Sequence, residues 1–466
     1  MQSLTRLRAP LAAIASKSHP TLPKGPRQKP AGAVPDAQRR VASLPGSAGS
    51  LGTTAESGAA FGGSNPLKPA PAKGLREFTD SETGEIITFR QHHDCSVSVV
   101  RSPAEKRVLR YERKAAAVSI LGKRHRIAAC HANPIKNAKV IEVWAKLGTA
   151  LPGHFRGLQT CALSWLCSVC APKIAERRAA EIESAMTICK AQGGQVLMPT
   201  FTVPHGRQDS LADTLDLIKK ALRSMGMSRK YKNLQAELLT IGRITATEIT
   251  HGEANGWHPH FHELWFFEAA GVDVVDLEDR LYVMWRAACL KFGLGEPSRK
   301  HGVIVQDGSK AASYVSKMGS KEWKLSDEIA KASSKGGRKA SRSAWELLDC
   351  VLDDLATIPH QKRAESLFRE YAIATKGRSQ LLWSPGLKKY FAVAEMNDEE
   401  LVAVAEEDAI LVANIELHHW KAIRKQNAQA HILNAVQFGA DAVHALVRYF
   451  VERIPVICND KGEVPA

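Results

Sequence analysis

The pattern of apolar and polar residues divides the middle of the chain into helices and strands. Apolar residues that recur at helical spacing predict four helices, at Ile174–Gln192, Leu211–Met225, Leu281–Phe292 and Lys310–Met318. Short apolar runs predict four strands, at Val196–Val203, Leu238–Thr250, His258–Phe267 and Val303–Val305. Turn-forming residues between the second and third strands predict a long hairpin. This order predicts an α+β fold, with an antiparallel sheet at about 190–320 and flanking helices.

Three other segments extend this pattern. Pro199 lies inside the first predicted strand, and since proline has no amide hydrogen to donate, we expect it at a sheet edge or a bulge. Residues 320–343 are rich in Lys and Ser and predict a solvated loop. The chain from Trp345 onward is predicted to be largely helical, including Glu399–Ile415 and a long segment from His418 to about Arg453.

Residues 1–75 have no periodic apolar pattern and are rich in Pro, Gly, Ser and Ala. Such a segment cannot bury enough surface to offset the entropy of ordering, so it predicts a disordered basic tail. The tail holds ten Lys and Arg residues against Asp36 and Glu56, which is half of the formal net charge of +16. The rest of the chain is moderately basic, and this charge is compatible with a polyanionic partner.

The distribution of apolar residues also bears on location. No apolar run reaches the roughly 18–20 residues that a membrane-spanning helix needs, and the N-terminus does not match a secretory signal. We therefore expect a cytoplasmic protein with no membrane partner. Nine cysteines, an odd number, in a chain with no export signal favour reduced thiols over disulfides.

The segment from Gly256 to Phe266 carries the strongest chemical signal, because it holds His258, His260 and His262 at alternate positions. Alternate side chains of a strand share one face, so at least His260 and His262 point the same way. Two imidazoles at this spacing can chelate a divalent ion, with Phe261 and Leu264 facing the opposite layer or the core. The alternative is a histidine-rich strand that binds no metal.

Glu248 lies on the other strand of the same predicted hairpin and could complete the set of ligands. Its oxygen atoms suit Mg²⁺ or Mn²⁺, although it could equally be an ordinary surface carboxylate. His205 follows the first predicted strand. It could approach the metal, but we expect an ordinary loop residue there.

A cysteine group precedes the predicted sheet. Cys167 and Cys170 have the spacing of half a zinc site, and Cys161 and Cys130 could complete a set of four sulfur ligands for a structural Zn²⁺. The alternative is that these cysteines are small buried apolar residues beside the following helix.

A candidate nucleophile lies about fifty residues after the histidines. On the predicted helix, Tyr314 and Lys317 are three residues apart and share a side. A phenol with a pKa near 10 is a weak nucleophile at neutral pH, and a nearby ammonium can stabilise the phenolate or bind a phosphate. Taken alone, a Tyr-x-x-Lys pattern also fits a packed surface tyrosine.

Together these segments resemble the HUH endonucleases, in particular the plasmid rolling-circle replication initiator (Rep) proteins. The resemblance rests on the His258-Pro259-His260-Phe261-His262 strand and on Tyr314-Val315-Ser316-Lys317. Further similar segments follow the family order from about 115 to 395: Gly157–Lys173 with its cysteines, Thr200–His205, Phe368–Tyr371, Lys376–Arg378 and Trp383-Ser384.

The resemblance implies a specific activity and set of partners. His260 and His262 would be the metal pair and Tyr314 the nucleophile that attacks a phosphodiester in a single-stranded or hairpin origin. The products would be a 5′-phosphotyrosine and a free 3′-hydroxyl, extended by the host polymerase with a host helicase in the bacterial cytoplasm. Two positions depart from the pattern: Ser168 stands where related proteins often have Pro, and Lys310 stands where some initiators have a carboxylate used at termination.

The resulting organisation has five parts. They are a tail at 1–75, a Cys-rich segment at 115–190, an HUH nicking core at 191–320, a basic loop with a family-like segment at 321–395, and a helical C-terminal region at 396–466. Two other functions remain open at this point. One is another HUH enzyme, a relaxase or a transposase, and the other is a zinc-containing DNA-binding regulator without catalysis.

Overall fold

The computed structural model describes the strand backbones within 75–99 and then residues 102–148, 153–308, 341–353, 356–403 and 408–452. All of these residues belong to one of the two units of the chain, Pro71–Ala466. The predicted helix Lys310–Met318, with Tyr314 and Lys317, lies outside the described residues. So do the tail up to residue 74 and almost all of the predicted loop 320–343.

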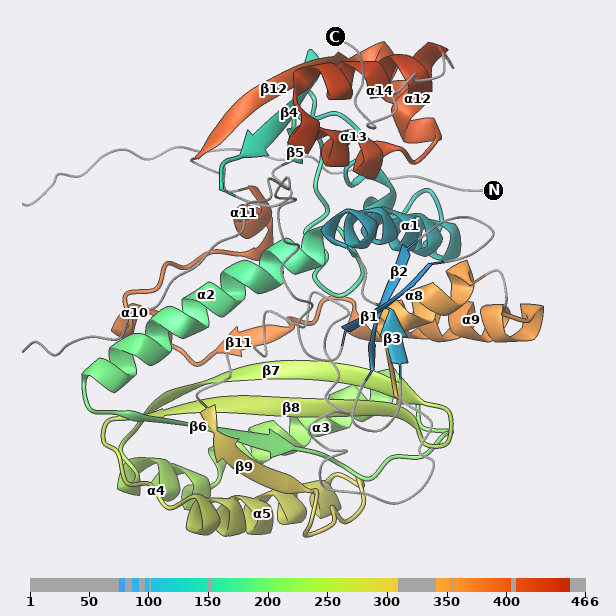
Figure 1. Ribbon diagram of the computed structural model, residues 1–466. Helices are drawn as coiled ribbons and strands as arrows, with labels where there is room; N and C mark the ends of the chain where they lie inside the picture. Colours follow the sequence, from blue (N-terminus) through green and yellow to red (C-terminus); the bar gives the residue numbers. More distant parts are fainter. Residues whose placement is uncertain are drawn as a thin grey trace, which may run out of the picture. The chain divides into compact units, whose positions relative to one another are not determined.

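The first part of the described chain contains three strands, a helix, two more strands and a second helix (Figure 1). These elements are β1 (Leu75–Thr79), β2 (Ile86–Gln91), β3 (Val97–Val99), α1 (Pro103–Leu121), the short 3-10 helix η1 (Arg126–Ala129), β4 (Val140–Lys146), β5 (Gly153–Arg156) and α2 (Cys170–Ala191). Strands β1 to β3 pair antiparallel in that order. The predicted helix at 174–192 is confirmed as most of α2.

The middle of the chain forms the predicted sheet and its helices. It contains β6 (Gln195–Phe201), α3 (Leu211–Met227), α4 (Arg229–Glu237), β7 (Thr240–Gly252), β8 (Gly256–Phe267), α5 (Val274–Lys291) and β9 (Val303–Asp307). The four strands and the helices at α3 and α5 were predicted. Helix α4 was not, and α5 begins seven residues before its predicted start because Asp273 caps it by accepting hydrogen bonds from two backbone amides.

The central sheet is antiparallel, in the order β10-β7-β8-β6-β9. Its longest pairing is the predicted β7–β8 hairpin, in which Glu248 lies opposite His260 and Gly252 opposite Gly256. Gly256 has φ of +73°, and a Cβ atom there would lie 2.9 Å from the carbonyl oxygen of Gly206. The turn therefore requires glycine both for its backbone conformation and for the close approach of the neighbouring loop.

Helices cover both faces of this sheet, with α4 and α5 below it and α2 above it in the view of Figure 1. Trp265 packs its ring against Tyr231 of α4, and Phe201 packs against Trp285 of α5. On the other face, Leu264 and Phe266 share a core with residues of α2. Phe261 faces away from the histidines as predicted, whereas Leu264 is on the histidine face, because residues of equal parity in a strand point the same way.

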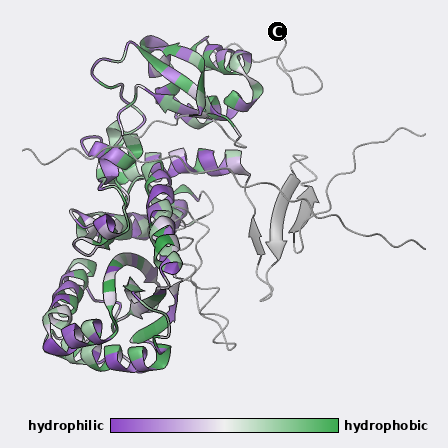
Figure 2. Ribbon diagram, turned by 90° about the vertical axis from the view of Figure 1, so that its left-hand side faces the viewer, coloured by the Kyte–Doolittle hydropathy of each residue, from purple (hydrophilic) through white to green (hydrophobic). Residues whose placement is uncertain are grey.

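Figure 2 shows hydrophobic and hydrophilic residues alternating along the helices around this sheet, as expected for helices that bury one side.

The position of Pro199 differs from the prediction. It was expected at a sheet edge or a bulge, but β6 is an interior strand between β8 and β9. Its pairing with β8 is interrupted at Met198 and Pro199 and resumes at Thr200 in the same register. The sheet thus accommodates a proline by leaving a gap in one ladder, and neither an edge position nor a bulge is needed.

The last part of the chain is less helical than predicted. It contains β10 (Arg342–Ser343), α8 (Ala344–Leu352), α9 (Ile358–Thr375), β11 (Leu381–Trp383), α10 (Leu387–Tyr390), α11 (Asp398–Ala403), β12 (Ala409–Glu416), α12 (Leu417–Lys425), α13 (Gln429–Ala435), η3 (Val436–Phe438) and α14 (Ala440–Glu452). Strand β11 pairs with β7 of the central sheet, and β12 forms a separate three-stranded sheet in the order β12-β4-β5.

Two helix predictions in this region were wrong. The predicted helix Glu399–Ile415 is α11 followed by the strand β12, where buried Ala413 and Ile415 alternate with exposed residues. A short apolar run is compatible with either a strand or a helix. This one forms a strand because it pairs with the distant β4. The predicted long helix from His418 is divided at Asn427 and Gly439, which have φ of +54° and +93°. None of the described helices combines the length and hydropathy needed to span a membrane.

Candidate functional site

Four histidines, His205, His258, His260 and His262, form a row of rings in contact with one another at one face of the central sheet. The ring centroids of His205 and His258 are 4.2 Å apart, those of His258 and His260 4.0 Å, and those of His260 and His262 6.0 Å. Strand β8 supplies three of them at alternate positions. His205 comes from the loop after β6, so it is a loop residue as predicted and also lies beside the row.

His262 is fixed by hydrogen bonds from two other strands. Its Nδ1 lies 2.9 Å from the hydroxyl oxygen of Thr200, the residue of β6 that lies opposite His262 in the sheet. Its Nε2 lies 3.3 Å from Oε2 of Glu248 on β7. Two ligand atoms bound to one ion at about 2.1 Å are separated by about 3.0–3.4 Å. The pair His262–Glu248 therefore has a separation that suits either a hydrogen bond or a shared divalent ion.

Burial keeps the imidazoles of His258, His260 and His262 neutral. Removal from water lowers the pKa of His258 to about 2, with smaller contributions from His260 and His205. It also lowers the pKa of His260 and of His262 to about 3 in each case. A neutral imidazole presents a lone pair, which is the form that binds a metal ion. Among the described residues no hydrogen-bond partner reaches the buried Nδ1 of His260.

The histidine row and Glu248 do not form a closed metal cage in this conformation. In the described part of the chain, the ligand atoms of three or more His, Cys, Asp or Glu side chains converge in one place. That place is the group of Cys130, Cys161, Cys167 and Cys170, not the histidine row. An ion at Glu248 and His262 would therefore need a rotation of the His260 ring, or ligands from a substrate or water, to complete its coordination. Carboxylate and imidazole together suit Mn²⁺ or Mg²⁺.

Two residues beside the site were not selected by sequence reasoning. Thr200 was quoted only as part of a family-like segment, and its contact with His262 depends on strand pairing that one sequence does not reveal. Tyr371 of α9 is buried, and its ring stacks on Trp257 at 6.0 Å. Burial raises the pKa of Tyr371, and the carboxylate of Glu248 raises it further. The Tyr371 phenol therefore stays protonated at neutral pH, and a protonated phenol is a poor nucleophile.

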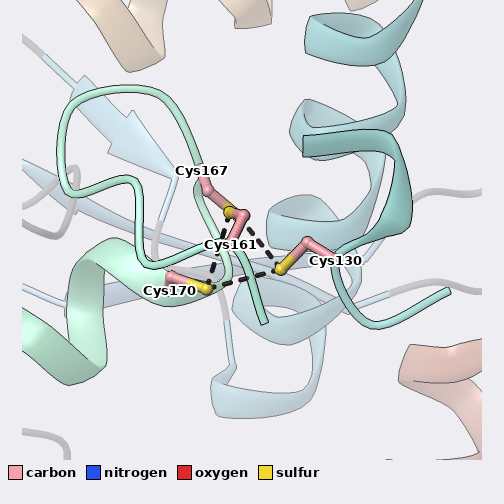
Figure 3. A group of neighbouring side chains, drawn as sticks. All are labelled: Cys130, Cys161, Cys167 and Cys170. Carbon is pink, nitrogen blue, oxygen red and sulfur yellow. Dashed lines mark hydrogen bonds between the residues drawn. The ribbon is translucent and has the colours of Figure 1, made fainter. Parts of the chain in front are cut away.

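The cysteine group predicted from spacing is brought together (Figure 3). Cys130 follows η1, Cys161 and Cys167 lie in the loop before α2, and Cys170 is the first residue of α2. The sulfur of Cys130 lies 3.4 Å from that of Cys170 and 3.7 Å from that of Cys167, and Cys161 lies 3.8 Å from Cys170. All four ligand atoms lie within 4.8 Å of one another, and all four residues are buried. This group can hold a structural metal ion.

The thiols of this group influence one another strongly. Burial raises the pKa of Cys167, and hydrogen bonds from the three neighbouring thiols lower the pKa of Cys170. Cys170 also begins a helix, where backbone amides favour negative charge. Without a metal, the group would thus concentrate its negative charge on one sulfur.

Comparisons with known proteins give one extended similarity. The chain is 27% identical over 315 residues to a protein named Protein rep from Streptomyces lividans, in a match that covers 54% of this chain and 69% of that protein. It is 31% identical over 132 residues to a Neomycin resistance protein from Streptomyces cyanogenus, a match that covers 23% of this chain and only 30% of that protein. No family model and no solved structure matches the chain.

Proposed function

We propose that this protein initiates rolling-circle replication of a plasmid by nicking and rejoining one DNA strand at the origin. The observation that carries this proposal is the convergence of Glu248 and His262 from the two strands of one hairpin, with Thr200 holding His262 from a third strand. The similarity to Protein rep supports a role in plasmid replication. The nicking chemistry comes from the residues themselves and from their resemblance to HUH enzymes.

In this proposal His260, His262 and Glu248 hold one Mg²⁺ or Mn²⁺ ion. When bound, the ion would neutralise charge on the scissile phosphate and polarise a P–O bond. Neutral imidazoles carry the lone pairs that the ion would bind, and the contact with Thr200 restrains the His262 ring. This arrangement positions the phosphate before any bond breaks, which is a large part of catalysis for a charged substrate.

Tyr314 is the proposed nucleophile. Its phenolic oxygen would attack phosphorus and form a phosphotyrosine bond to the 5′ side, while the bond to the 3′ oxygen breaks and leaves a 3′-hydroxyl. The phenolic proton is lost on activation, and the ammonium of Lys317 would stabilise the phenolate. Because one phosphoester replaces another, a later attack by a 3′-hydroxyl can reverse the step and join strands.

The length of chain after β9 is compatible with this role. Asp307 ends β9 and pairs with Leu197, three residues along β6 from the Thr200–His262 pair. That offset corresponds to about 10 Å of strand. The seven residues from Asp307 to Tyr314 can span at most about 25 Å, so the tyrosine can reach the histidine row.

The test of this function is a single substitution, Tyr314→Phe. The wild-type protein, with Mn²⁺ and single-stranded origin DNA, is expected to form a covalent protein–oligonucleotide adduct on a denaturing gel, and the variant to form none. DNA binding is expected to stay near the wild-type level, since only one hydroxyl is lost. Tyr449→Phe, at an exposed position of α14, is the matched control. A normal adduct yield from Tyr314→Phe would refute the assignment.

A further inference from the structure

The four-cysteine group has the dimensions of a mononuclear zinc site. Tetrahedral zinc with bonds of about 2.3 Å places its sulfur ligands about 3.8 Å apart. Three of the separations in the group are 3.4, 3.7 and 3.8 Å, and all four sulfurs lie within 4.8 Å of one another. A disulfide would require about 2.05 Å, and all four cysteines are free. The sulfurs are thus spaced as ligands of one ion and not as bonded pairs.

Burial alone does not produce this convergence, as another cysteine shows. Cys189 of α2 is also fully buried, and its sulfur contacts the carbonyl oxygens of Gln195 and Phe267. Ordinary buried cysteines behave in this way, as small apolar side chains. In the four-cysteine group, by contrast, sulfurs from three separate segments point at one another (Figure 3).

The surroundings supply positive charge. Four thiolates and one Zn²⁺ carry a net charge of two negative units, which needs compensation in a buried place. Lys114 of α1 is 5% exposed, and its ammonium donates a hydrogen bond of 2.6 Å to the carbonyl oxygen of Cys130. The start of α2 at Cys170 adds backbone amides and the positive end of the helix dipole. A buried ammonium is itself costly unless an anion lies near, and the thiolates meet that need.

The three segments that carry the cysteines are attached to different parts of the fold. Next to Cys130, Trp420 of α12 donates a 2.8 Å hydrogen bond to the carbonyl oxygen of Ala132. Between Cys161 and Cys167, Trp165 donates one of 2.7 Å to the carbonyl oxygen of Arg378. Cys170 begins α2, which continues into β6 and hence to the residue that orients His262.

We propose that Cys130, Cys161, Cys167 and Cys170 bind one structural zinc ion, with Lys114 as its buried counter-charge. The ion would fasten the start of α2 and the segment after η1 to each other. A backbone hydrogen bond between His131 and Gln159 already joins the segment after η1 to the chain that leads into α2, and Ser168 donates a hydrogen bond to the carbonyl oxygen of Arg110 in α1. The ion would add a covalent link to these contacts. The role is structural, and it does not depend on the proposed nicking function.

The first experiment measures metal in the full-length protein, purified without added zinc or chelator. Elemental analysis is expected to find one zinc per chain. Cobalt exchanged into the site is expected to give the thiolate charge-transfer absorption and the visible bands of a tetrahedral sulfur site. Wild-type protein that lacks zinc, shows no such cobalt spectrum and exposes all four thiols to a thiol reagent under native conditions would overturn the proposal.

The second experiment locates the ion. The double variant Cys161→Ser/Cys167→Ser is expected to lose zinc and to be cleaved faster by a protease between about 122 and 170. Cys350→Ser, at a cysteine outside the group, is the control and keeps its zinc. The double variant His260→Ala/His262→Ala is also expected to keep it, which separates this ion from the proposed catalytic one. Zinc that stays in the cysteine variant and leaves the histidine variant would refute the site. If the cysteine variant does not fold, the wild-type zinc content and cobalt spectrum still decide.

Discussion

Thr200 shows what a single residue contributes at the candidate site and why the sequence did not identify it. The alternation of His258, His260 and His262 is visible in the sequence, because a strand places every second side chain on one face. The bond between Thr200 and His262 joins residues 62 positions apart, through a register that only the folded sheet defines. The local pattern therefore predicts the candidate ligands, while the residues that orient them come from long-range pairing.

Removing the Thr200 hydroxyl tests this orienting role. Thr200→Val keeps the shape of the side chain and removes the contact with Nδ1 of His262. Loss of such a contact typically weakens metal binding by about 10- to 100-fold. We expect the Mn²⁺ concentration for half-maximal nicking to rise by a similar factor, with near-normal activity at saturation. Thr245→Val is the control, since that hydroxyl contacts Glu263 instead. Equal metal dependence in both variants would show that Thr200 does not orient the ligand.

The buried histidines also predict how stability depends on pH. His258, His260 and His262 have folded-state pKa values of about 2 to 3, while the unfolded chain has about 6.5. Between these values the unfolded state binds more protons, so stability falls as pH falls below 6.5, by at most about 1.4 kcal/mol per pH unit for each histidine. Urea unfolding of the metal-free protein at pH 7, 6 and 5 measures the slope. His258→Asn is expected to flatten it and His418→Asn, at an exposed position, to leave it unchanged. Equal slopes in all three proteins would contradict the burial of these rings.

At the scale of elements, long segments with a clear period were predicted well and short apolar runs were not. The β7–β8 hairpin and helices α2 and α3 agree with their predicted positions, because their own sequences favour those structures. Strand β12 was predicted as helix, since its conformation depends on pairing with β4, more than 260 residues earlier. Pro199 fits inside a sheet because one ladder can be interrupted for two residues, which a local rule on proline does not anticipate.

The turn of the β7–β8 hairpin gives a prediction about this element. Gly256→Ala must adopt φ near +73° and place its Cβ 2.9 Å from the carbonyl oxygen of Gly206. The left-handed backbone alone costs about 1–2 kcal/mol, and the crowding adds to it. Gly271→Ala is the matched control, because that glycine has φ of +101° and nothing within 4 Å of its Cβ position. We expect a larger loss of unfolding free energy for Gly256→Ala, measured by urea titration. Equal losses would mean that the neighbouring loop yields without cost.

At the scale of the whole molecule, composition distinguishes residues 1–75 from the remainder of the chain, but it does not predict how distant segments of that remainder pack together. The sequence predicts that Cys130 could join Cys161, Cys167 and Cys170, and the structure brings the four together. The sequence does not show how α1 and η1 place Cys130 beside the other three. It also gives no sign that α12 holds the segment beside Cys130 by a hydrogen bond from Trp420. Contacts between regions so far apart in the chain depend on packing that no local pattern encodes.

Removing residues 1–74 tests how the tail acts in the whole protein. This segment carries ten Lys and Arg against two acidic residues, and the described fold begins after it. Binding to DNA releases about 0.9 counterions for each phosphate neutralised, so a tail that touches DNA adds to the slope of log affinity against log salt. We expect the shortened protein to bind DNA more weakly at low salt with a shallower slope, while its melting temperature and its nicking at the origin stay near wild type.

A full-length variant with the ten basic residues of the tail changed to Gln separates charge from length. It should match the shortened protein in its salt slope if the tail acts through its charge. A large fall in melting temperature on shortening would instead show that the tail packs against the folded part, against the prediction of disorder. An unchanged slope in both proteins, with nicking intact, would mean that half of the net charge takes no part in DNA binding. The DNA affinity would then have to come from the moderately basic remainder of the chain, and charge substitutions there would be the ones that alter the slope.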